Sequence, residues 1–338
     1  MSISYSDKYP YVIAEAGVNH NGDLETAFRL MRAAKFAGAN AIKYQVFSPE
    51  ELVTPTLEKA KYQKENTGQG TQFSMLSKLA LPISDFKKLY THAKGIGIDF
   101  IVTPYSVNDA KQMADSVDAF KISSGDITHT PLIKEVLSYN LPVILSTGMA
   151  SLSDIDRIAS IVKKLSNKPD IYLLHCVSAY PCSPNSVNLP SMERLKAFGY
   201  PVGYSDHTEG IGVPVAAVSL GATIIEKHLT LDRNMSGPDH KMAMDPTMFK
   251  HMIEECLKAH KAVTPACFIP SEGEDPITAR RSLKAAKFLK KGTVLSVTDF
   301  KILRPATGLP PYYIDMFTGL TTTCDIEEND DILWKNFK

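Results

Sequence analysis

The chain has 338 residues, of which 44% are hydrophobic and 22% charged, and 37 basic residues balance 37 acidic ones to a formal net charge of zero. This composition is typical of a folded globular protein and excludes a largely disordered chain. The balanced charge and the lack of basic runs argue against a general nucleic-acid binder.

Cysteine usage and hydropathy predict the compartment. The five cysteines have no regular spacing and do not form a disulfide framework, so we expect a reducing, cytoplasmic location. The stretch MSISYSDKYPYV contains no apolar signal core. The longest apolar stretch, 213–225, is shorter than the ~20 residues that span a bilayer and contains Pro214 and Gly221. We therefore expect no membrane span and no secretion.

Short apolar runs alternate with amphipathic stretches along residues 1–263. Eight runs have the character of strands: Tyr11–Ala16, Ala41–Gln45, Asp99–Thr103, Ala119–Ile122, Pro142–Ser146, Ile171–His175, Val202–Ser205 and Thr223–His228. The helical patterns between them include Leu24–Ala37 with Asp23 as its N-cap, Ser84–Lys94, Leu152–Leu165 and Pro246–Val263. Eight such repeats predict an α/β fold, a (β/α)8 TIM barrel, in preference to an open doubly wound sheet.

Two segments interrupt this repeat. Residues 46–81 are long for a connection between a strand and a helix, and they form either a surface excursion or a lid over the barrel mouth. Residues 264–278 contain three prolines and one glycine, which is the composition of a linker. The sequence therefore predicts a catalytic barrel at 1–263, a linker at 264–278 and a small second domain at 279–338.

The predicted strands end in polar side chains, which is where TIM barrels carry their chemistry. These side chains include Glu15, Lys43, Gln45, Thr103, Lys121, Ser146, His175, Ser205, Asp206, His207, Glu226, Lys227 and His228. A buried charge without a partner is costly, so this ring predicts a hydrated, charged ligand site. The pattern favours an enzyme without indicating one reaction.

His207 and His228 are the best candidates for metal ligands. They end neighbouring strands, which lie ~4.8 Å apart, so both imidazoles could meet one ion. Closure of the barrel brings Glu15 to the same side. Two histidines and a carboxylate suit divalent manganese, iron or zinc, whereas a lone histidine is more often structural. Three further histidines are alternative candidates: His20, His175 and His240.

Lys43 and Lys121 lie on the second and fourth predicted strands and face the same mouth. A desolvated lysine could form a Schiff base with a carbonyl substrate, as in an aldolase. Alternatively, both lysines stay charged and bind a phosphate or carboxylate together with nearby hydroxyls and glycines. We favour the anion-binding interpretation.

Short motifs occur in a fixed order along the chain. They are EAGVNHNGD, IKYQ, TPYS, KISSGD, LSTGM, LHCVSAYP, GYSDHT, EKHLT, GPDHK, RRSL and LRPATGL. In these motifs the chain resembles the sialic acid synthase family, also called N-acetylneuraminate or nonulosonate synthases, over nearly its whole length. The resemblance implies a catalytic TIM barrel followed by a small antifreeze-like (SAF) domain. It also implies a domain-swapped homodimer in which that domain caps the partner's barrel.

The resemblance implies a transferase that condenses phosphoenolpyruvate (PEP) with an N-acylated hexosamine such as N-acetylmannosamine. The products are a nine-carbon 2-keto acid of the N-acetylneuraminate type and phosphate. Synthesis of N,N'-diacetyllegionaminate or pseudaminate by the same mechanism is the alternative, and a pyruvate aldolase is a more remote one. The implied cofactor is a divalent metal, manganese before magnesium or cobalt, which polarises the sugar aldehyde.

The resemblance also implies roles for those residues whose motifs match the motifs of the family. His207 and His228 are implied as metal ligands, and Glu15 is implied to orient the aldehyde or a water on the metal. The resemblance assigns PEP to Lys43, Thr103, Lys121, Ser124, Ser146, Ser178 and Ser205. It assigns the sugar to Gln45, Asp126, Tyr180, Asp239 and, from the partner's second domain, Arg304. Ser178 and Asp126 depart from some members, which carry an amide and a glutamate there.

Overall fold

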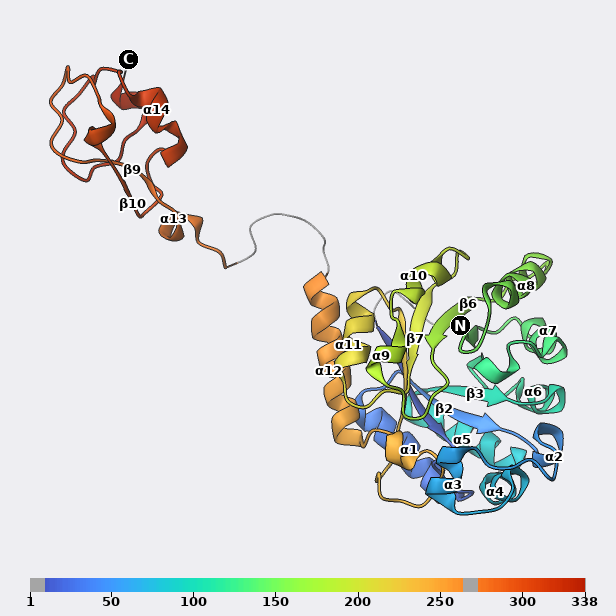
Figure 1. The fold of residues 1–338 in the computed structure, drawn as a ribbon. Coiled ribbons are helices and arrows are strands. Elements are labelled where there is room, and N and C mark those ends of the chain that lie inside the picture. Colours follow the sequence, from blue (N-terminus) through green and yellow to red (C-terminus); the bar gives the residue numbers. More distant parts are fainter. Residues whose placement is uncertain (1–9, 264–272, 338) are drawn as a thin grey trace. The chain divides into compact units, whose positions relative to one another are not determined.

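The computed structural model describes residues 10–263 and 273–337, and the chain divides into two compact units, Met1–Pro265 and Ala266–Lys338 (Figure 1). Most of the predicted linker, 264–278, lies outside the described residues. The described chain resumes at Gly273 and enters the short helix α13 (Pro276–Ala279). The predicted boundaries at 263 and 279 therefore stay predictions.

The first unit is a closed barrel of eight parallel strands. In order around the barrel these are β1 (Tyr11–Gly17), β2 (Ala41–Val46), β3 (Asp99–Pro104), β4 (Ala119–Ile122), β5 (Val143–Ser146), β6 (Ile171–Cys176), β7 (Val202–Asp206) and β8 (Ile224–His228). Strand β8 pairs in parallel with β1 and closes the ring. Each boundary lies within one residue of its prediction, and the TIM barrel is confirmed.

Helices cover the outside of this barrel (Figure 1). They are α1 (Leu24–Ala37), α5 (Ile83–Ile96), α6 (Val107–Met113), α7 (Thr130–Ser138), α8 (Leu152–Lys163), α9 (Pro184–Val187), α10 (Ser191–Lys196), α11 (Gly212–Ser219) and α12 (Pro246–Val263). The predicted cap of α1 is confirmed, because the Asp23 carboxylate accepts a hydrogen bond from the backbone N–H of Thr26. None of the described helices is both long and apolar enough to cross a bilayer.

The segment at 46–81 folds into three short helices, α2 (Pro49–Leu52), α3 (Lys61–Thr67) and α4 (Gln72–Leu79). Met75 and Leu79 are buried against Val18 and Phe47, which directly follow β1 and β2. This contact places the segment at the carboxyl ends of the strands. Its position agrees with the lid interpretation, although closure of a lid stays a prediction.

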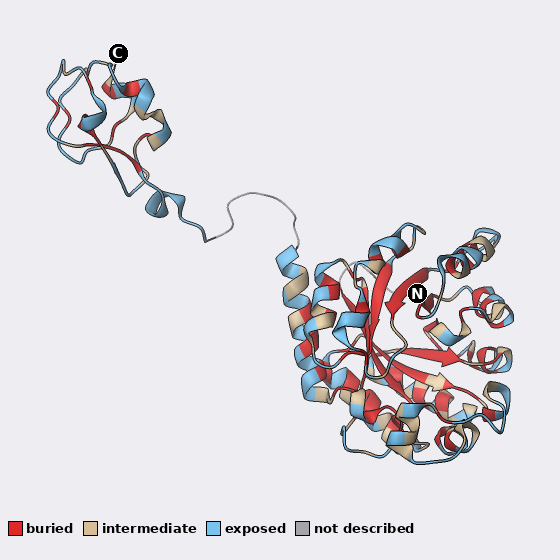
Figure 2. Ribbon diagram, viewed as in Figure 1, coloured by how far each residue is buried: buried red, intermediate tan, exposed pale blue. Residues whose placement is uncertain are grey.

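Figure 2 shows the barrel strands as almost entirely buried. Along these strands the inward-facing side chains change from apolar to polar. The apolar layer consists of Tyr11, Ile13, Ala41, Ile101, Ala119, Ile144, Tyr172, Leu174 and Ile224. Strand side chains alternate with a period of two, so the next inward positions are Glu15, Lys43, Thr103, Lys121, Ser146, Cys176 and Glu226. The apolar layer is therefore a floor, and the polar ring lies above it at the mouth.

The same alternation turns Asp206 and Lys227 away from the barrel interior. Their side chains form an ion pair with only 0% and 1% of their surfaces exposed. Asp206 also accepts hydrogen bonds from the Tyr204 hydroxyl at 2.8 Å and from the Thr208 backbone N–H at 2.9 Å. This pair therefore joins β7 to β8 on the outer face and takes no part in the interior ring.

The second unit is small and has a core of its own. Strands β9 (Ser282–Ala285) and β10 (Phe300–Leu303) pair antiparallel, and α14 (Ile314–Phe317) follows them. Leu283, Phe317 and Ile332 belong to one buried apolar cluster within this unit.

Replacement of Lys227 by alanine tests the outer ion pair. The Asp206 carboxylate would stay buried without its cation, so we expect the free energy of unfolding to fall by about 3–5 kcal/mol in urea denaturation. Lys196→Ala is the matched control, since it removes an exposed pair with Glu193 and should cost no more than about 1 kcal/mol. Equal losses in the two variants would contradict a structural role for the buried pair.

Candidate active site

The polar ring lines a cavity of about 70 Å³ at the barrel mouth. Of the sequence-predicted site residues, the cavity collects Glu15, Lys43, Gln45, Thr103, Lys121, Ser124, Ser146, Tyr180, Ser205, His207 and His228. Six of the seven residues predicted for PEP are therefore brought together. The seventh, Ser178, is hydrogen-bonded to one of them, with its Oγ 2.9 Å from the Oγ of Ser124.

Gly148 makes room for this serine pair. A Cβ at position 148 would lie 2.7 Å from the Oγ of Ser178 and 3.2 Å from the Oγ of Ser124. The absence of a side chain at Gly148 therefore leaves the space that these two hydroxyl groups occupy.

Four buried charges occupy the centre of the cavity. Lys43 Nζ lies 2.8 Å from Glu15 Oε2 and 3.7 Å from Glu226 Oε1. Lys121 Nζ lies 3.1 Å from both carboxylate oxygens of Glu226. Two cations thus face two anions, and the lysines have carboxylate partners before any ligand binds.

Sequence reasoning placed Glu226 at the end of a strand without giving it a role. Its carboxylate also accepts a hydrogen bond from the Ser205 hydroxyl at 3.0 Å. The signal that could have identified it is the period of two in β8, which places Glu226 and His228 on one face and Lys227 on the other. Glu226 is thus the common partner of both predicted anion-binding lysines.

The environment sets different protonation preferences for these charges. Burial raises the pKa of Glu226, but Lys121 and Lys43 outweigh it and bring the pKa down to about 2. Burial also raises the pKa of Glu15, and there Lys43 compensates only in part. Burial opposes a charged Lys43, but Glu15 and Glu226 hold its pKa above the ordinary value. Burial lowers the pKa of Lys121 despite the charge of Glu226. Glu226 and Lys43 are therefore the firmly ionised members.

The His207 and His228 rings meet at the edge of this cavity, with centroids 5.6 Å apart. His207 Nδ1 lies 2.8 Å from the carbonyl oxygen of Val177, a contact that leaves Nε2 with its lone pair when Nδ1 carries the proton. His228 Nδ1 is buried and has no hydrogen-bond partner. Burial lowers the pKa of both rings, so both are neutral at pH 7, the form that binds metal.

These two histidines fit a divalent ion that takes its other ligands from substrate, water or a nearby carboxylate. Glu15 lies opposite His228 in the register of β1 and β8. Within residues 10–263 and 273–337, no group of three or more His, Cys, Asp or Glu side chains is arranged to hold a metal. The described protein therefore supplies at most a partial ligand set, which leaves positions open for substrate.

The three alternative histidines have structural partners. His175 Nε2 contacts the carbonyl oxygen of Val187, and His240 Nδ1 lies 2.7 Å from the hydroxyl oxygen of Thr230. His20 Nδ1 accepts a hydrogen bond from the backbone N–H of Gly22. None of the three lines the charged cavity.

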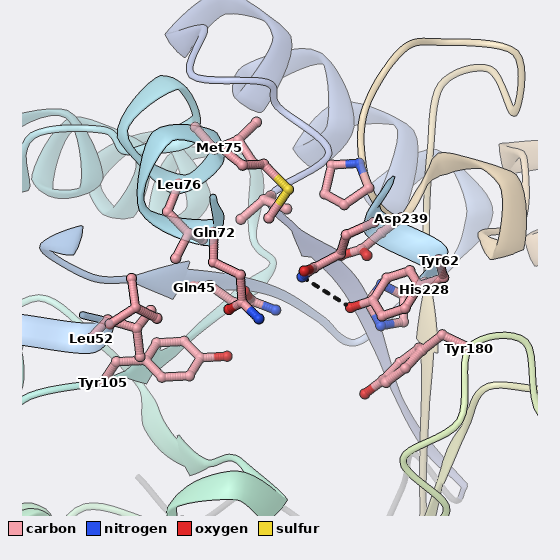
Figure 3. A pocket seen from close by; sticks show the side chains of 15 residues that line it. Gln45, Leu52, Tyr62, Gln72, Met75, Leu76, Tyr105, Tyr180, His228 and Asp239 are labelled. Atoms are coloured by element: carbon pink, nitrogen blue, oxygen red, sulfur yellow. Dashed lines mark hydrogen bonds between the residues drawn. The ribbon is translucent and has the colours of Figure 1, made fainter. Parts of the chain in front are cut away.

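A second cavity of about 250 Å³ adjoins the first and shares Gln45, Tyr105, Tyr180 and His228 with it. Figure 3 shows Tyr180 and Asp239 on the His228 side of this cavity. Gln45, Tyr180 and Asp239, which were predicted to contact the sugar, are therefore brought together. The segment at 46–81 supplies a further wall of this cavity. A lid was one of the two alternatives predicted for this segment, but its three helices were not predicted.

Two predicted sugar contacts are not among the residues that line these two cavities. Asp126 lies in a short 3-10 turn, where it accepts a 2.6 Å hydrogen bond from the Ser123 hydroxyl, and it lines neither cavity. Arg304 belongs to the second unit, and its side chain is exposed there. Their predicted contacts with the sugar stay predictions.

Asp239 gives the barrel a testable dependence on pH. Burial, and then the charge of Glu15, raise its pKa to about 7. The unfolded chain releases this proton near pH 4, so the contribution of Asp239 to wild-type stability should fall as the pH rises from 4 to 7. Asp239→Asn should remove this loss and gain on the order of 3 kcal/mol over the wild type at pH 8 in urea denaturation.

The matched control for this comparison is the exposed residue Asp156, as Asp156→Asn. Its stability should follow the wild type at pH 4.5 and at pH 8. A constant difference between Asp239→Asn and the wild type across this range would show that Asp239 is not buried with a raised pKa.

Comparisons with known proteins agree with this architecture. The NeuB family model matches residues 30–266, and the SAF domain model matches residues 280–338, which confirms the predicted type of the second domain. Two relatives named N,N'-diacetyllegionaminic acid synthase cover nearly the whole chain. The protein from Legionella pneumophila is 40% identical, covering 97% of this chain and 94% of its own length. The protein from Campylobacter jejuni is 39% identical, covering 96% and 98%.

A solved structure of a sialic acid synthetase has a similar fold. The N-acetylneuraminic acid (sialic acid) synthetase from Leptospira borgpetersenii, crystallised in complex with citrate, is 33% identical and superposes with a TM-score of 0.71. The match covers 81% of this chain and 94% of that chain. On the family match, the relatives and the fold together, this chain belongs to the NeuB family.

Proposed function

We propose that this chain is a PEP-dependent synthase that condenses PEP with an N-acylated hexosamine to give a nine-carbon 2-keto acid and phosphate. The observation that carries the proposal is the pair of adjoining cavities with His228 between them. One cavity is small and charged, as an anion such as PEP requires. The other is larger and carries Gln45, Tyr180 and Asp239, which suit the hydroxyl and amide groups of a sugar.

The charged cavity can bind the phosphate and carboxylate of PEP through Lys43, Lys121 and the surrounding hydroxyls. The Ser146 Oγ is buried and has no hydrogen-bond partner, so it is a donor available to an anion. The hydroxyl of Thr103 already lies 3.1 Å from Lys43 Nζ. Because Glu15 and Glu226 neutralise the lysines, PEP must share these cations with the carboxylates.

The two histidines are proposed to hold a divalent ion, with manganese preferred over magnesium or cobalt. When bound there, the ion supplies Lewis acidity that polarises the sugar aldehyde. His207 and His228 act as ligands through neutral rings. Glu15 is oriented by Gln45, whose Nε2 donates to Glu15 Oε1 at 3.1 Å, and it would direct the aldehyde or the attacking water.

The reaction forms one carbon–carbon bond, and at C2 a carbon–oxygen bond to water replaces the carbon–oxygen bond to the phosphate group. The methylene carbon of PEP attacks the aldehyde carbon of the open-chain sugar, and the aldehyde oxygen takes a proton to become a hydroxyl. Water then adds to the cationic C2 and loses a proton. Collapse to the ketone expels phosphate, which leaves from among Lys43, Lys121 and the hydroxyl groups of the small cavity.

Assembly and location are proposed from the same family resemblance. A homodimer in which the partner's SAF domain reaches the barrel mouth would bring Arg304 to the N-acyl group. A reducing cytoplasm is supported by the described cysteines, Cys176, Cys182, Cys256 and Cys324, all of which are free.

The reaction itself is tested with PEP, manganese and a panel of N-acylated hexosamines, read by phosphate release and product mass. We expect a product with the combined carbon skeleton of PEP and one sugar, and we expect EDTA to abolish it. A borohydride-trapped lysine adduct with pyruvate, without any reaction of PEP, would instead support the aldolase interpretation and overturn this one.

The metal assignment is tested with the double variant His207→Ala, His228→Ala. Without both imidazoles the protein should lose manganese binding in titration calorimetry and lose at least about 1,000-fold in turnover, because polarisation of the aldehyde contributes several kcal/mol. The exposed His251 supplies the control, as His251→Ala, with binding unchanged. Manganese binding retained by a folded double variant would refute the assignment.

A further inference from the structure

The segment at 46–81 also borders a hollow of about 340 Å³ that lies outside the candidate active site. The hollow shares Met75, Leu79 and Pro238 with the larger cavity, but it contains none of the polar strand ends. Its polar lining, which we call the lysine hollow, consists of Asn21, Lys59, Thr67, Ser74, Lys78 and Ser236. None of the described residues that line it is Asp or Glu, so the lysine hollow is positively charged in a chain of zero net charge.

Lys59 brings a buried cation to this hollow. Only 7% of the residue is exposed. Its Nζ donates to the Oγ of Thr67 at 2.9 Å and to the carbonyl oxygen of Gly68 at 3.0 Å, with longer contacts to two further carbonyl oxygens. These acceptors satisfy the protons of the ammonium group at the end of α3. They are neutral groups, however, and they leave the full charge of Lys59 without a counter-ion.

The other buried lysines show what Lys59 lacks. Five lysines are buried in the part of the chain that the structure describes. Four of them form an ion pair with a carboxylate, and these are Lys43 with Glu15, Lys121 with Glu226, Lys227 with Asp206 and Lys284 with Asp331. Lys59 is the exception, because every oxygen that its Nζ contacts belongs to a neutral group. A buried charge without a partner is costly, so this position calls for an anion that no described residue supplies.

The loop between α3 and α4 leaves room for such an anion. Gly70 has a φ of +126°, a conformation that favours glycine. A Cβ at this position would lie 3.3 Å from the Oγ of Ser74 and 4.0 Å from the Nζ of Lys59. The missing side chain therefore leaves space beside a hydroxyl group and a buried ammonium group at once.

Lys78 adds a second cation to the lysine hollow from α4. It is exposed, and its side chain makes no ion pair or hydrogen bond with the residues that the structure describes. Lysine binds phosphate as a point charge, and hydroxyl groups supply further hydrogen bonds to the oxygens of an anion. Two ammonium groups with hydroxyls beside them therefore suit a doubly charged oxyanion.

We propose that the lysine hollow is a binding site for a phosphate-type oxyanion, either inorganic phosphate or the phosphate group of a small ester, with Lys59 and Lys78 as its cationic contacts. The anion supplies the counter-charge that Lys59 lacks, and it joins the end of α3 to α4 through two charged contacts. Met75 and Leu79 line both this hollow and the larger cavity, so the anion stabilises a wall of the candidate active site from outside it.

The test counts the phosphate bound per chain by equilibrium dialysis with radiolabelled inorganic phosphate, at constant ionic strength, in EDTA and without PEP or sugar. Lys78→Met should weaken binding at one site by about tenfold to 100-fold, because one charged hydrogen bond to the anion is lost. At phosphate concentrations that saturate the wild type, this variant should bind one phosphate fewer per chain. Phosphate held in the charged cavity is common to both proteins and cancels in the difference.

The matched control is Lys61→Met, since Lys61 is an exposed lysine of α3 that does not line the hollow. It should bind as much phosphate as the wild type. Lys59→Met should weaken the site as Lys78→Met does, and it should abolish the part of the rise in Tm with phosphate that this site contributes. Should Lys59→Met fail to fold, the exposed Lys78 still decides the question.

A second arm of the experiment distinguishes the two sources of the phosphate group. Glycerol 3-phosphate competes with the labelled phosphate, and its affinity for the site is taken from the difference between the wild type and Lys78→Met. An affinity above that of inorganic phosphate assigns the site to a phosphate ester, and an equal or lower affinity assigns it to free phosphate.

Two outcomes would overturn the inference. One is equal phosphate binding by the wild type and a folded Lys78→Met. The other is an equal loss in Lys61→Met and Lys78→Met, which would show attraction by overall charge alone. Because the measurement involves no turnover, its failure leaves the proposed function intact, and failure of the proposed function leaves this inference intact.

Discussion

The buried ion pairs of Glu226 with Lys121 and Lys43 are the constraint on which the site depends. Two cations inside a barrel are tolerable only with anions beside them, and Glu226 contacts both. Glu15 completes the balance through its 2.8 Å contact with Lys43. The barrel can therefore fold with an intact charge cluster in the absence of ligand, and a bound anion has to exchange partners with carboxylates already in place.

The apolar floor makes this arrangement possible. Side chains such as Ile13, Ile101 and Ile144 close the interior below the charges, so the polar ring faces only the mouth. The strand period of two then separates the charges at the ends of β7 and β8 into two clusters. Glu226 enters the interior cluster, whereas Lys227 pairs with Asp206 outside it. A shift of one residue along the strand thus decides whether a charged side chain lies inside the barrel, in the candidate site, or outside it, in a structural ion pair.

The fold could be predicted from the sequence because strands and helices of this barrel follow local patterns. The apolar runs gave all eight strands, and helix α1 was predicted to its last residue with Asp23 as its cap. The polar strand ends also identified most of the charged cavity, since barrel topology brings the carboxyl ends of all strands to one rim.

The missed features depend on contacts that are distant in sequence. Glu226 forms its ion pairs with lysines that are distant in the chain, and the nearer of them, Lys121, is 105 positions away. The helices of the segment at 46–81 are short. Their side chains line the larger cavity because this segment packs against the ends of β1 and β2. Asp126 is a different case, since this polar residue next to a strand end has a local hydrogen-bond partner in Ser123 and its contact with the sugar stays a prediction.

The two adjoining cavities are built by different parts of the barrel. The charged cluster and the histidines are fixed by strand register, so a change there disturbs both folding and reaction. Leu52 and Leu76 of the larger cavity instead belong to α2 and α4, and they pack against a cluster in which Met75 and Leu79 of α4 contact Val18 and Phe47. Leu52 and Leu76 can therefore change without altering any strand. The lining of the larger cavity can thus vary while the charged cluster of the smaller cavity stays unchanged, because Leu52 and Leu76 line only the larger one.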